Sequence, residues 1–253
     1  MKVEVPLDSE EVRRILCYPR CDEEEYKRRI KELKGLGISA LISEGKVRIG
    51  RMRVLGKGCV SIVVLAKDKE GNLRALKIRR TDSNREDLLR EAGILRRIND
   101  MGIGPKLYGF SRNVLVMEYV EGEGLKKWLL SNHRRYDLIR YVLRELLDQC
   151  FKLDRANIIH KELSMPEGHV IVRRDTLRPC LLDFETVSLK SRKRNLTQLA
   201  GYLFFKEGEV SKVVKRALGL NESKLIELRR VLKEYKGGKM EGAYRELLSI
   251  LKL

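Results

Sequence analysis

The chain begins with two stretches in which apolar side chains have the spacing of a helix. Apolar side chains recur every three or four positions over residues 8–18 and again over residues 22–35, which predicts two short helices. Asp8 and Asp22 begin these stretches and are expected to cap the helices, because a side-chain oxygen there accepts a hydrogen bond from a free amide of the first turn.

A strand-like composition follows at residue 38. Residues 38–43 and 46–49 are rich in apolar side chains, and Glu44-Gly45 lies between them. This pattern predicts two strands joined by a tight turn. We therefore expect residues 1–50 to form an N-terminal helix–helix–hairpin module, similar to a winged helix, before the main domain.

From residue 51 the pattern predicts one larger domain, in which a strand-rich part precedes a helical part. The fold class is therefore α+β, with a first lobe over residues 51–120 and a second over residues 121–253. The expected strands cover residues 62–66, 73–79, 107–110, 114–117 and 170–172, and the expected helices cover residues 85–99, 125–130, 136–153, 195–217 and 222–251.

The charge of the chain indicates a polyanionic partner. The net charge is +18 at pH 7, well beyond what solubility needs. Residues 1–50 are nearly neutral, whereas residues 186–253 hold 16 basic and 7 acidic side chains. A heat-adapted, thermophilic surface also carries many charges, but its ion-pair networks balance the two signs. The imbalance therefore favours a nucleic acid as the partner.

The sequence also bears on the compartment. No apolar run approaches the length of a membrane span and no secretory leader is visible, so we expect a cytoplasmic protein with no membrane partner. The five cysteines are scattered, which predicts reduced thiols. Cys17 and Cys21 form a C-x3-C pair, but no second pair or nearby histidine accompanies them, so ordinary packing is favoured over a metal site.

A glycine-rich loop lies between two expected strands. Residues 55–63 read Leu-Gly-Lys-Gly-Cys-Val-Ser-Ile-Val and differ from the kinase pattern Gly-x-Gly-x-x-Gly-x-Val only at the third glycine. Glycines let backbone amides approach phosphate oxygens without an intervening side chain. The candidate phosphate-binding residues of this loop are Gly56, Lys57, Gly58, Cys59 and Ser61.

Lys77 and Glu91 follow the loop in the order that kinases use. Residues 75–78, Ala-Leu-Lys-Ile, match the kinase pattern Val-Ala-Ile-Lys. Lys77 is therefore expected to bind the α- and β-phosphates of ATP, and Glu91, on the next expected helix, is the carboxylate that would hold it.

A hinge-like segment comes next. Residues 117–122 read Met-Glu-Tyr-Val-Glu-Gly, a strand end followed by an acid and a glycine. In a kinase hinge, the backbone of Glu118 and Val120 would form hydrogen bonds with the edge of the adenine.

Two later motifs carry the expected chemistry. His160-Lys161-Glu162-Leu163 takes the place of the kinase loop His-Arg-Asp-Leu, and Asp183-Phe184-Glu185 takes that of Asp-Phe-Gly. Glu162 is expected to orient and deprotonate the attacking hydroxyl. His160 belongs to the same catalytic motif, and Asp183 is the leading ligand for Mg²⁺.

The second metal ligand has two candidates. Counting from the catalytic motif to the position of the usual asparagine reaches Glu167, but the strand that normally follows that asparagine begins at Val170, which makes His169 its equivalent. Magnesium prefers oxygen ligands, which favours Glu167, whereas the register of the strand favours His169. Both candidates stay open at this point.

Basic side chains beyond Asp183 are the candidate nucleic-acid contacts. A basic run shortly after Asp183 is expected to flank the site, and further basic residues on the following helix are expected to extend the same surface. These candidates are Lys190, Arg192, Lys193, Arg194, Lys212, Lys215 and Arg216.

Residues 51–185 resemble the eukaryotic-like kinase fold, and no Ala-Pro-Glu motif follows. The whole chain resembles an archaeal family of atypical, predicted serine/threonine kinases, on Leu-Gly-Lys-Gly-Cys at 55–59, Ala-Leu-Lys-Ile-Arg-Arg-Thr-Asp-Ser-Asn-Arg at 75–85 and His-Lys-Glu-Leu-Ser at 160–164. That family resembles the archaeal tRNA kinases that phosphorylate an internal ribose 2′-hydroxyl. The resemblance implies ATP, Mg²⁺ and a tRNA substrate.

Four functions are compatible with these motifs. An RNA kinase agrees with the kinase elements, the missing peptide-docking region and the basic tail. A serine/threonine protein kinase leaves the charge unexplained, and a small-molecule kinase would need acidic or aromatic substrate contacts. A non-catalytic RNA-binding pseudokinase is the fourth, because Glu162 replaces the usual aspartate. The sequence favours the RNA kinase.

Overall fold

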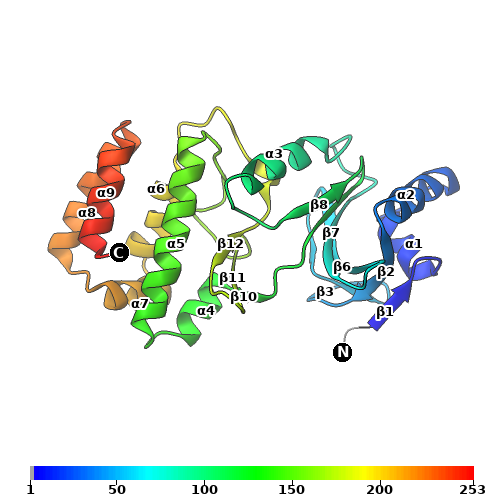
Figure 1. The fold of residues 1–253 in the computed structure, drawn as a ribbon, viewed down its shortest axis with the longest axis horizontal. Helices are drawn as coiled ribbons and strands as arrows, with labels where there is room; N and C mark the ends of the chain where they lie inside the picture. Colours follow the sequence, from blue (N-terminus) through cyan, green and yellow to red (C-terminus); the bar gives the residue numbers. More distant parts are fainter. Residues whose placement is uncertain (1–2) are drawn as a thin grey trace. The chain divides into compact units, whose positions relative to one another are not determined.

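The computed structural model describes residues 3–253, so the first two residues of the expected N-terminal module lie outside it. The chain divides into two compact units, Met1–Val120 and Glu121–Leu253, here called the N-lobe and the C-lobe (Figure 1). The N-lobe is built on an antiparallel sheet and the C-lobe is mostly helical. The expected α+β fold class is therefore confirmed. Within residues 3–253, no helix is long and apolar enough to cross a membrane.

One seven-stranded sheet organises the N-lobe. Its strands follow the order β1-β2-β6-β7-β9-β8, with β5 paired to β6, and every pairing is antiparallel. Three strands have the predicted bounds, β2 (Ile38–Ser43), β7 (Leu73–Arg79) and β8 (Leu107–Phe110). The others are β1 (Val3–Pro6), β5 (Gly56–Lys57), β6 (Ser61–Asp68) and β9 (Val114–Glu118).

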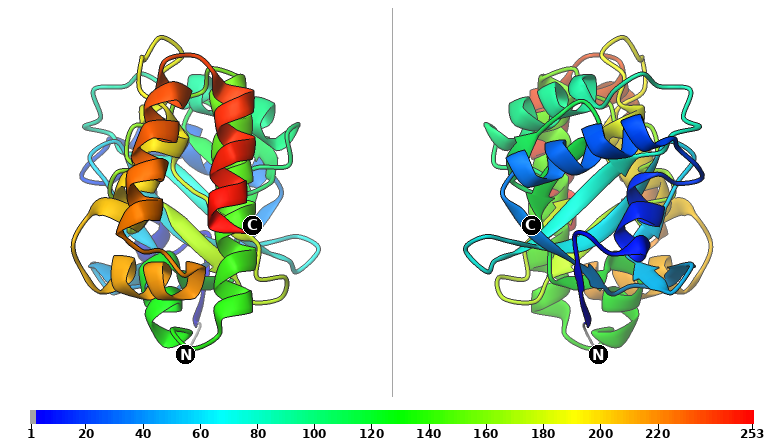
Figure 2. Two further views of the ribbon diagram at one scale, coloured as in Figure 1. Left: turned by 90° about the vertical axis from the view of Figure 1, so that its left-hand side faces the viewer. Right: turned by 90° about the vertical axis from the view of Figure 1, so that its right-hand side faces the viewer.

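The two faces of this sheet pack against different helices, because successive residues of a strand point to opposite sides. Leu76 belongs to the hydrophobic core beneath α1 and α2, whereas Leu115 packs with residues of α3. Figure 2 shows α2 lying across one face of the strands. Lys77, next to Leu76, therefore faces α3. The helices of the lobe are α1 (Glu10–Leu16), α2 (Glu23–Gly35) and α3 (Leu89–Asn99).

Two strands of the N-terminal segment, β1 and β2, belong to the large sheet of the N-lobe. Strand β2 pairs with β1 on one side and with β6 on the other, so residues 3–43 continue the same sheet. The predicted hairpin between residues 38–43 and 46–49 is wrong. Strand β3 (Val47–Ile49) instead pairs with β4 (Met52–Val54) across Gly50 and Arg51.

Gly45 explains why the hairpin prediction failed. This glycine has a φ of +126°, and a Cβ atom there would lie 2.0 Å from the carbonyl oxygen of Val54. The sequence needs a glycine at position 45 because another segment of backbone passes close by. The turn itself lies at Gly50, with a φ of +58°.

A buried arginine fastens α2 to the sheet. Arg29 has no exposed surface, and its guanidinium donates to the carbonyl oxygens of Leu16 (2.9 Å) and Arg79, and to the Asn113 side chain. Its charge is balanced by Glu25, whose carboxylate lies 2.7 Å from Nε. Arg29 thus connects both N-terminal helices to the end of β7.

We expect an Arg29→Met variant to lose about 3–5 kcal/mol of unfolding free energy, because it removes the charged partner of a buried network. Arg28→Met is the matched control. Arg28 pairs with the same Glu25 at 2.7 Å but is largely exposed, so its loss should cost at most about 1 kcal/mol. Chemical denaturation measures both values, and equal losses would contradict the role of Arg29.

Two local predictions near the N-terminus are corrected. Ser9, not Asp8, caps α1, since its hydroxyl accepts from the Val12 amide at 3.3 Å; Asp22 caps α2 as predicted. The prediction that all five cysteines are reduced is also wrong. The structure joins Cys17 to Cys21 in a disulfide with a Cα–Cα distance of 4.9 Å, within the range that disulfides span.

The C-lobe surrounds the long helix α5 (Tyr136–Arg155), which buries one apolar face. A small antiparallel sheet, β10-β11-β12, carries the loops that hold the catalytic motifs. The remaining elements are β10 (Gly122–Gly124), β11 (Val170–Arg173), β12 (Pro179–Leu181), α4 (Leu125–Ser131), the 3₁₀ turn η1 (Phe184–Thr186), α6 (Asn195–Ala200), the π-helical turn η2 (Gly201–Phe205), α7 (Glu209–Leu218), α8 (Glu222–Lys236) and α9 (Met240–Leu251).

Candidate functional site

The N-lobe contains the predicted ion pair. Lys77 points from β7 towards α3, and its Nζ lies 2.7 Å from Glu91 Oε1. Both side chains are about 95% buried, each with 5% of its surface exposed. A buried ammonium ion needs a carboxylate nearby, and Glu91 supplies it from the first turn of the helix.

The glycine-rich loop connects β5 to β6. Gly58 closes its turn, because the Gly58 amide donates to the Ser61 carbonyl oxygen at 2.8 Å. Cys59, a free thiol, is exposed at the tip, whereas Ser61 is buried at the start of β6. The positions predicted to bind phosphate thus lie on one short hairpin, with Gly56 and Lys57 on its first strand.

The hinge-like residues lie at the end of the N-lobe. Glu118 is the last residue of β9, and its amide donates to the Lys106 carbonyl oxygen at 2.8 Å. Val120 is buried and is the last residue of the lobe. Their predicted contacts with adenine stay predictions.

In the C-lobe, a buried histidine holds the catalytic loop. His160 has no exposed surface. Its Nε2 lies 2.9 Å from the carbonyl oxygen of Leu182, the residue before Asp183, and its Nδ1 accepts from the Glu162 amide at 3.3 Å. Because both ring nitrogens are engaged by the backbone, the geometry fits a positioning role for His160 between the two motifs.

The strand register brings His169 next to Leu182, the residue before Asp183. Strands β11 and β12 pair Val170 with Leu181, and the Leu182 amide donates to the His169 carbonyl oxygen at 2.8 Å. Glu167 lies elsewhere, in an ion pair with Lys126 at 3.3 Å and a hydrogen bond from the Tyr202 hydroxyl. Of the two candidates, the structure brings only His169 into contact with the catalytic motif.

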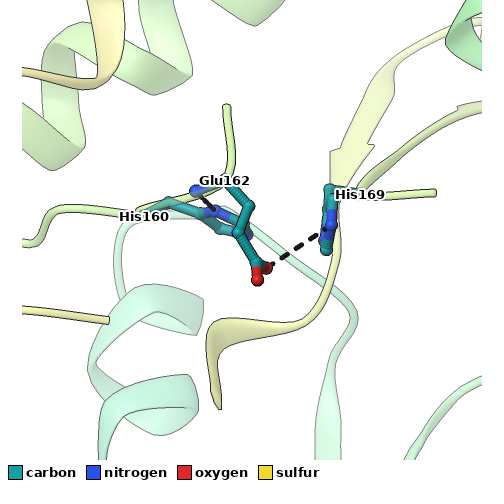
Figure 3. Close-up of side chains that lie close together, drawn as sticks. All are labelled: His160, Glu162 and His169. Carbon is teal, nitrogen blue, oxygen red and sulfur yellow. Dashed lines mark hydrogen bonds and ion pairs between the residues drawn. The ribbon is translucent and has the colours of Figure 1, made fainter. Parts of the chain in front are cut away.

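His169 and Glu162 form a pair at the centre of the loop, as Figure 3 shows. The Nε2 atom of His169 lies 3.4 Å from Glu162 Oε2. Among the described residues, neither Glu162 Oε2 nor His169 Nδ1 has a hydrogen-bond partner, although both atoms are buried. The pair therefore has unused hydrogen-bonding capacity.

These residues fit a divalent cation. Ligand atoms of His160, Glu162 and His169 lie within 4.8 Å of one another, but the ring nitrogens of His160 are already hydrogen-bonded. The Glu162 carboxylate offers the oxygen ligands that Mg²⁺ prefers, and His169 offers a nitrogen. A bound cation would neutralise phosphate charge there.

A buried polar network behind the loop escaped the sequence analysis. Asp154, at the end of α5, accepts from the Asn195 amide at 2.7 Å and from the Tyr235 hydroxyl at 3.0 Å. Asn195 then accepts from the His160 amide at 2.8 Å. Burial raises the pKa of Asp154. A polar residue at a helix start, such as Asn195, usually predicts only a cap, so the sequence contained no distinct signal for this role.

The basic run Lys190–Arg194 forms a loop that is attached to the catalytic segment at both ends. At its start, Ser188 and Ile159 exchange two backbone hydrogen bonds of 2.9 and 3.0 Å. At its end, Asn195 binds His160 as described above. The loop itself has Lys190, Arg192 and Lys193 exposed and Arg194 half-buried.

The other basic candidates lie apart from this loop. Lys212, Lys215 and Arg216 belong to α7, whose opposite face is buried. Within the C-lobe, the loop lies at the top and α7 at the bottom of Figures 1 and 2. The structure therefore does not bring the two groups into one surface.

We expect His160 to make stability depend on pH. Burial lowers the pKa of His160, so the folded protein keeps the ring neutral while the unfolded chain takes up a proton near its ordinary pKa of about 6.5. The free energy of unfolding should therefore decrease as pH falls from about 6.5 through the lowered pKa. Denaturation curves between about pH 5 and 7.5 measure this loss.

A His160→Gln variant should lose that part of the pH dependence, although it is less stable throughout. The exposed His133 provides the control, and His133→Gln should keep the wild-type pH dependence. Identical curves for wild type and His160→Gln would show that another group is responsible.

Known proteins support a kinase-like assignment. The chain is 30% identical to the KEOPS complex subunit Bud32 of Pyrococcus abyssi over 176 residues, which covers 64% of this chain and 76% of that protein. It is 28% identical to an uncharacterized protein of Methanocaldococcus jannaschii over 120 residues, 47% of this chain and 98% of that protein.

A third relative matches this chain over only a small part of its own length. Calcium-dependent protein kinase 4 of Plasmodium berghei is 29% identical over 130 residues, 46% of this chain and 24% of that protein. The RIO domain matches residues 65–196, just over half of the chain, and this range contains Lys77, Glu91, the catalytic loop and the basic run. The chain therefore belongs to the RIO domain family, an atypical kinase family.

Proposed function

We propose that this protein is a cytoplasmic ATP- and Mg²⁺-dependent RNA kinase that phosphorylates an internal ribose 2′-hydroxyl of tRNA. The observation that carries the proposal is the attachment of the basic loop to the catalytic segment. Ser188 binds Ile159 and Asn195 binds His160, so each end of the loop is hydrogen-bonded to a residue only two or three positions before Glu162. Exposed cations on a loop attached there suit a substrate that brings phosphates to the base.

Each residue has a defined part in the proposed reaction. Lys77, held by Glu91, binds the α- and β-phosphates. Glu162 accepts the proton of the 2′-hydroxyl while the oxygen of that hydroxyl forms a bond to the γ-phosphorus. At the same time the bond from the γ-phosphorus to the bridging oxygen of ADP breaks. His169 holds the Glu162 carboxylate, and Asp183 with His169 would hold Mg²⁺. The 2′-hydroxyl distinguishes RNA from DNA.

The direct test is a labelling reaction with γ-³²P-ATP, purified tRNA and total protein from the same cells. Label should enter tRNA, and tRNA that carries 2′-O-methyl groups or DNA of the same sequence should stay unlabelled. Label in polypeptides alone would support the atypical serine/threonine protein kinase. RNA binding without transfer of label would support the pseudokinase.

The basic loop provides the next prediction. Changing Lys190, Arg192 and Lys193 to Gln should raise the KM for tRNA and leave the Kd for ATP unchanged. If the three cations contact phosphates, the slope of log Kd against log salt concentration should decrease in magnitude by about 2–3. Arg194 is left intact, because it is half-buried and its charge acts on the buried Asp154.

Helix α7 offers a matched control with the same change of charge. Changing Lys212, Lys215 and Arg216 to Gln should leave the salt slope close to the wild-type value, because α7 lies away from the loop. If the α7 variant loses tRNA binding and the loop variant does not, the RNA site lies on α7 instead.

A further inference from the structure

The short segment between α1 and α2 contacts the glycine-rich loop through one tyrosine. Two cations lie close to the ring of Tyr18, with Lys57 Nζ 5.4 Å and Arg80 Cζ 5.2 Å from its centroid. The Tyr18 hydroxyl also accepts a hydrogen bond from Lys57 Nζ at 3.2 Å. A cation over an aromatic face is attracted by the ring quadrupole.

Both cations belong to the glycine-rich loop or are hydrogen-bonded to it. Lys57 lies between Gly56 and Gly58 in the loop itself. Arg80 follows β7, and its guanidinium donates to the Gly58 carbonyl oxygen at 2.8 Å while its amide donates to the Val60 carbonyl oxygen at 2.8 Å. The tyrosine therefore contacts the loop directly through Lys57 and indirectly through Arg80.

Tyr18 itself is firmly attached to the lobe. Its carbonyl oxygen accepts from the amide (2.9 Å) and the hydroxyl (3.0 Å) of Thr81. Two residues earlier, the Leu16 carbonyl oxygen accepts from the fully buried Arg29. A glycine-rich loop has large conformational freedom and few side chains that restrict it, so an anchored ring next to it can restrict that freedom.

We infer that Tyr18 is a positioning residue that holds the glycine-rich loop in the conformation that binds nucleotide. The expected effect on nucleotide binding rests on the proposed function, because that function makes the nucleotide the ligand of the loop. It also gives the N-terminal segment a role in the reaction. The side chain of Lys57 serves to hold the loop, while the backbone of the loop receives the phosphates.

The first measurement uses the free protein and needs no nucleotide. Hydrogen exchange of the amides of Gly58, Cys59 and Val60 should be faster in Tyr18→Leu than in wild type. Tyr108→Leu is the matched control, because Tyr108 is also under two cations, Arg74 at 3.8 Å and Lys106 at 5.2 Å, but lies on β8 at the far edge of the sheet. Unchanged exchange in Tyr18→Leu would overturn the inference.

The second measurement is ATP binding by calorimetry, together with steady-state kinetics. Loss of one hydrogen bond and of the cation–ring contacts should raise the Kd and the KM for ATP about tenfold in Tyr18→Leu. In Tyr18→Phe, which keeps the ring, the increase should be about threefold. Because the reacting groups are untouched, kcat should stay within about twofold, a separation that a general loss of structure would not produce.

Lys57→Met tests the contact from the other side. Its effect on the Kd for ATP should resemble that of Tyr18→Phe, because both substitutions remove the same hydrogen bond. The double variant Tyr18→Phe/Lys57→Met should therefore have a Kd no higher than that of either single variant. Additive effects would overturn the direct contact. Wild-type protein that binds no ATP would refute the proposed function, while hydrogen exchange would still decide whether Tyr18 holds the loop.

Discussion

A Glu162→Gln variant is expected to lose about 10²–10⁴-fold in kcat, the usual contribution of a general base, with little change in the Kd for ATP. The amide has nearly the same shape as the carboxylate but cannot accept the proton of the hydroxyl. Glu162 Oε2 is buried and lies 3.4 Å from His169 Nε2, and an amide of the same size fits this position, so the substitution changes the chemistry with little change of packing. Single-turnover phosphorylation of tRNA measures the rate.

Two further variants serve as controls for this prediction. Glu162→Asp keeps the carboxylate one methylene further back, so its rate should lie between wild type and Glu162→Gln. Glu167→Gln removes the same charge from the same loop, but Glu167 contacts Lys126 and Tyr202, so its rate should stay within a few-fold of wild type. A Glu162→Gln enzyme as fast as wild type would show that the base is another group.

Local sequence patterns predicted the features of the N-lobe that are determined within a single strand or helix. The apolar run at 73–79 became β7 with the same bounds. Its alternation places Leu76 in the core and Lys77 on the α3 face, where Glu91 meets it. In these cases a strand or helix period, read within one segment, is sufficient to fix which side a residue faces.

Features that depend on distant segments could not be predicted in this way. Arg29 lies in a highly charged stretch of the sequence, yet it is fully buried on α2, where it binds Leu16, Arg79 and Asn113. Gly45 looked like a turn, yet it makes room for the backbone of Val54. Both depend on which segments come together, which periodicity along the chain does not encode.

The second metal ligand depends in the same way on which segments come together. The sequence left Glu167 and His169 both open, and the register of β11 against β12 places His169 beside Leu182, the residue before Asp183. The anchor of the loop is likewise long-range, since Asn195 binds His160 across 35 residues. The sequence named the side chains of the site, but the pairing of strands and helices decides which of them meet.

A Lys77→Met variant is expected to lose ATP affinity and about 10²–10³-fold or more in kcat, because in the proposed reaction it removes the cation that binds the phosphates. It should also be less stable by about 3–5 kcal/mol, since Glu91, itself 5% exposed, keeps a buried charge without its ammonium partner. Inactivity of this variant alone would not separate the two effects.

The double variant Lys77→Met/Glu91→Leu separates them. Replacing both members of a buried ion pair by apolar residues of similar size is often neutral for stability, so its unfolding free energy should return close to the wild-type value. Its activity should stay as low as that of Lys77→Met, because the cation for the phosphates is still missing. Lys77→Arg, which retains the charge, should keep more ATP affinity than either. If the stable double variant phosphorylates tRNA at the wild-type rate, then Lys77 serves only the fold of the N-lobe, and the phosphates are bound by other groups.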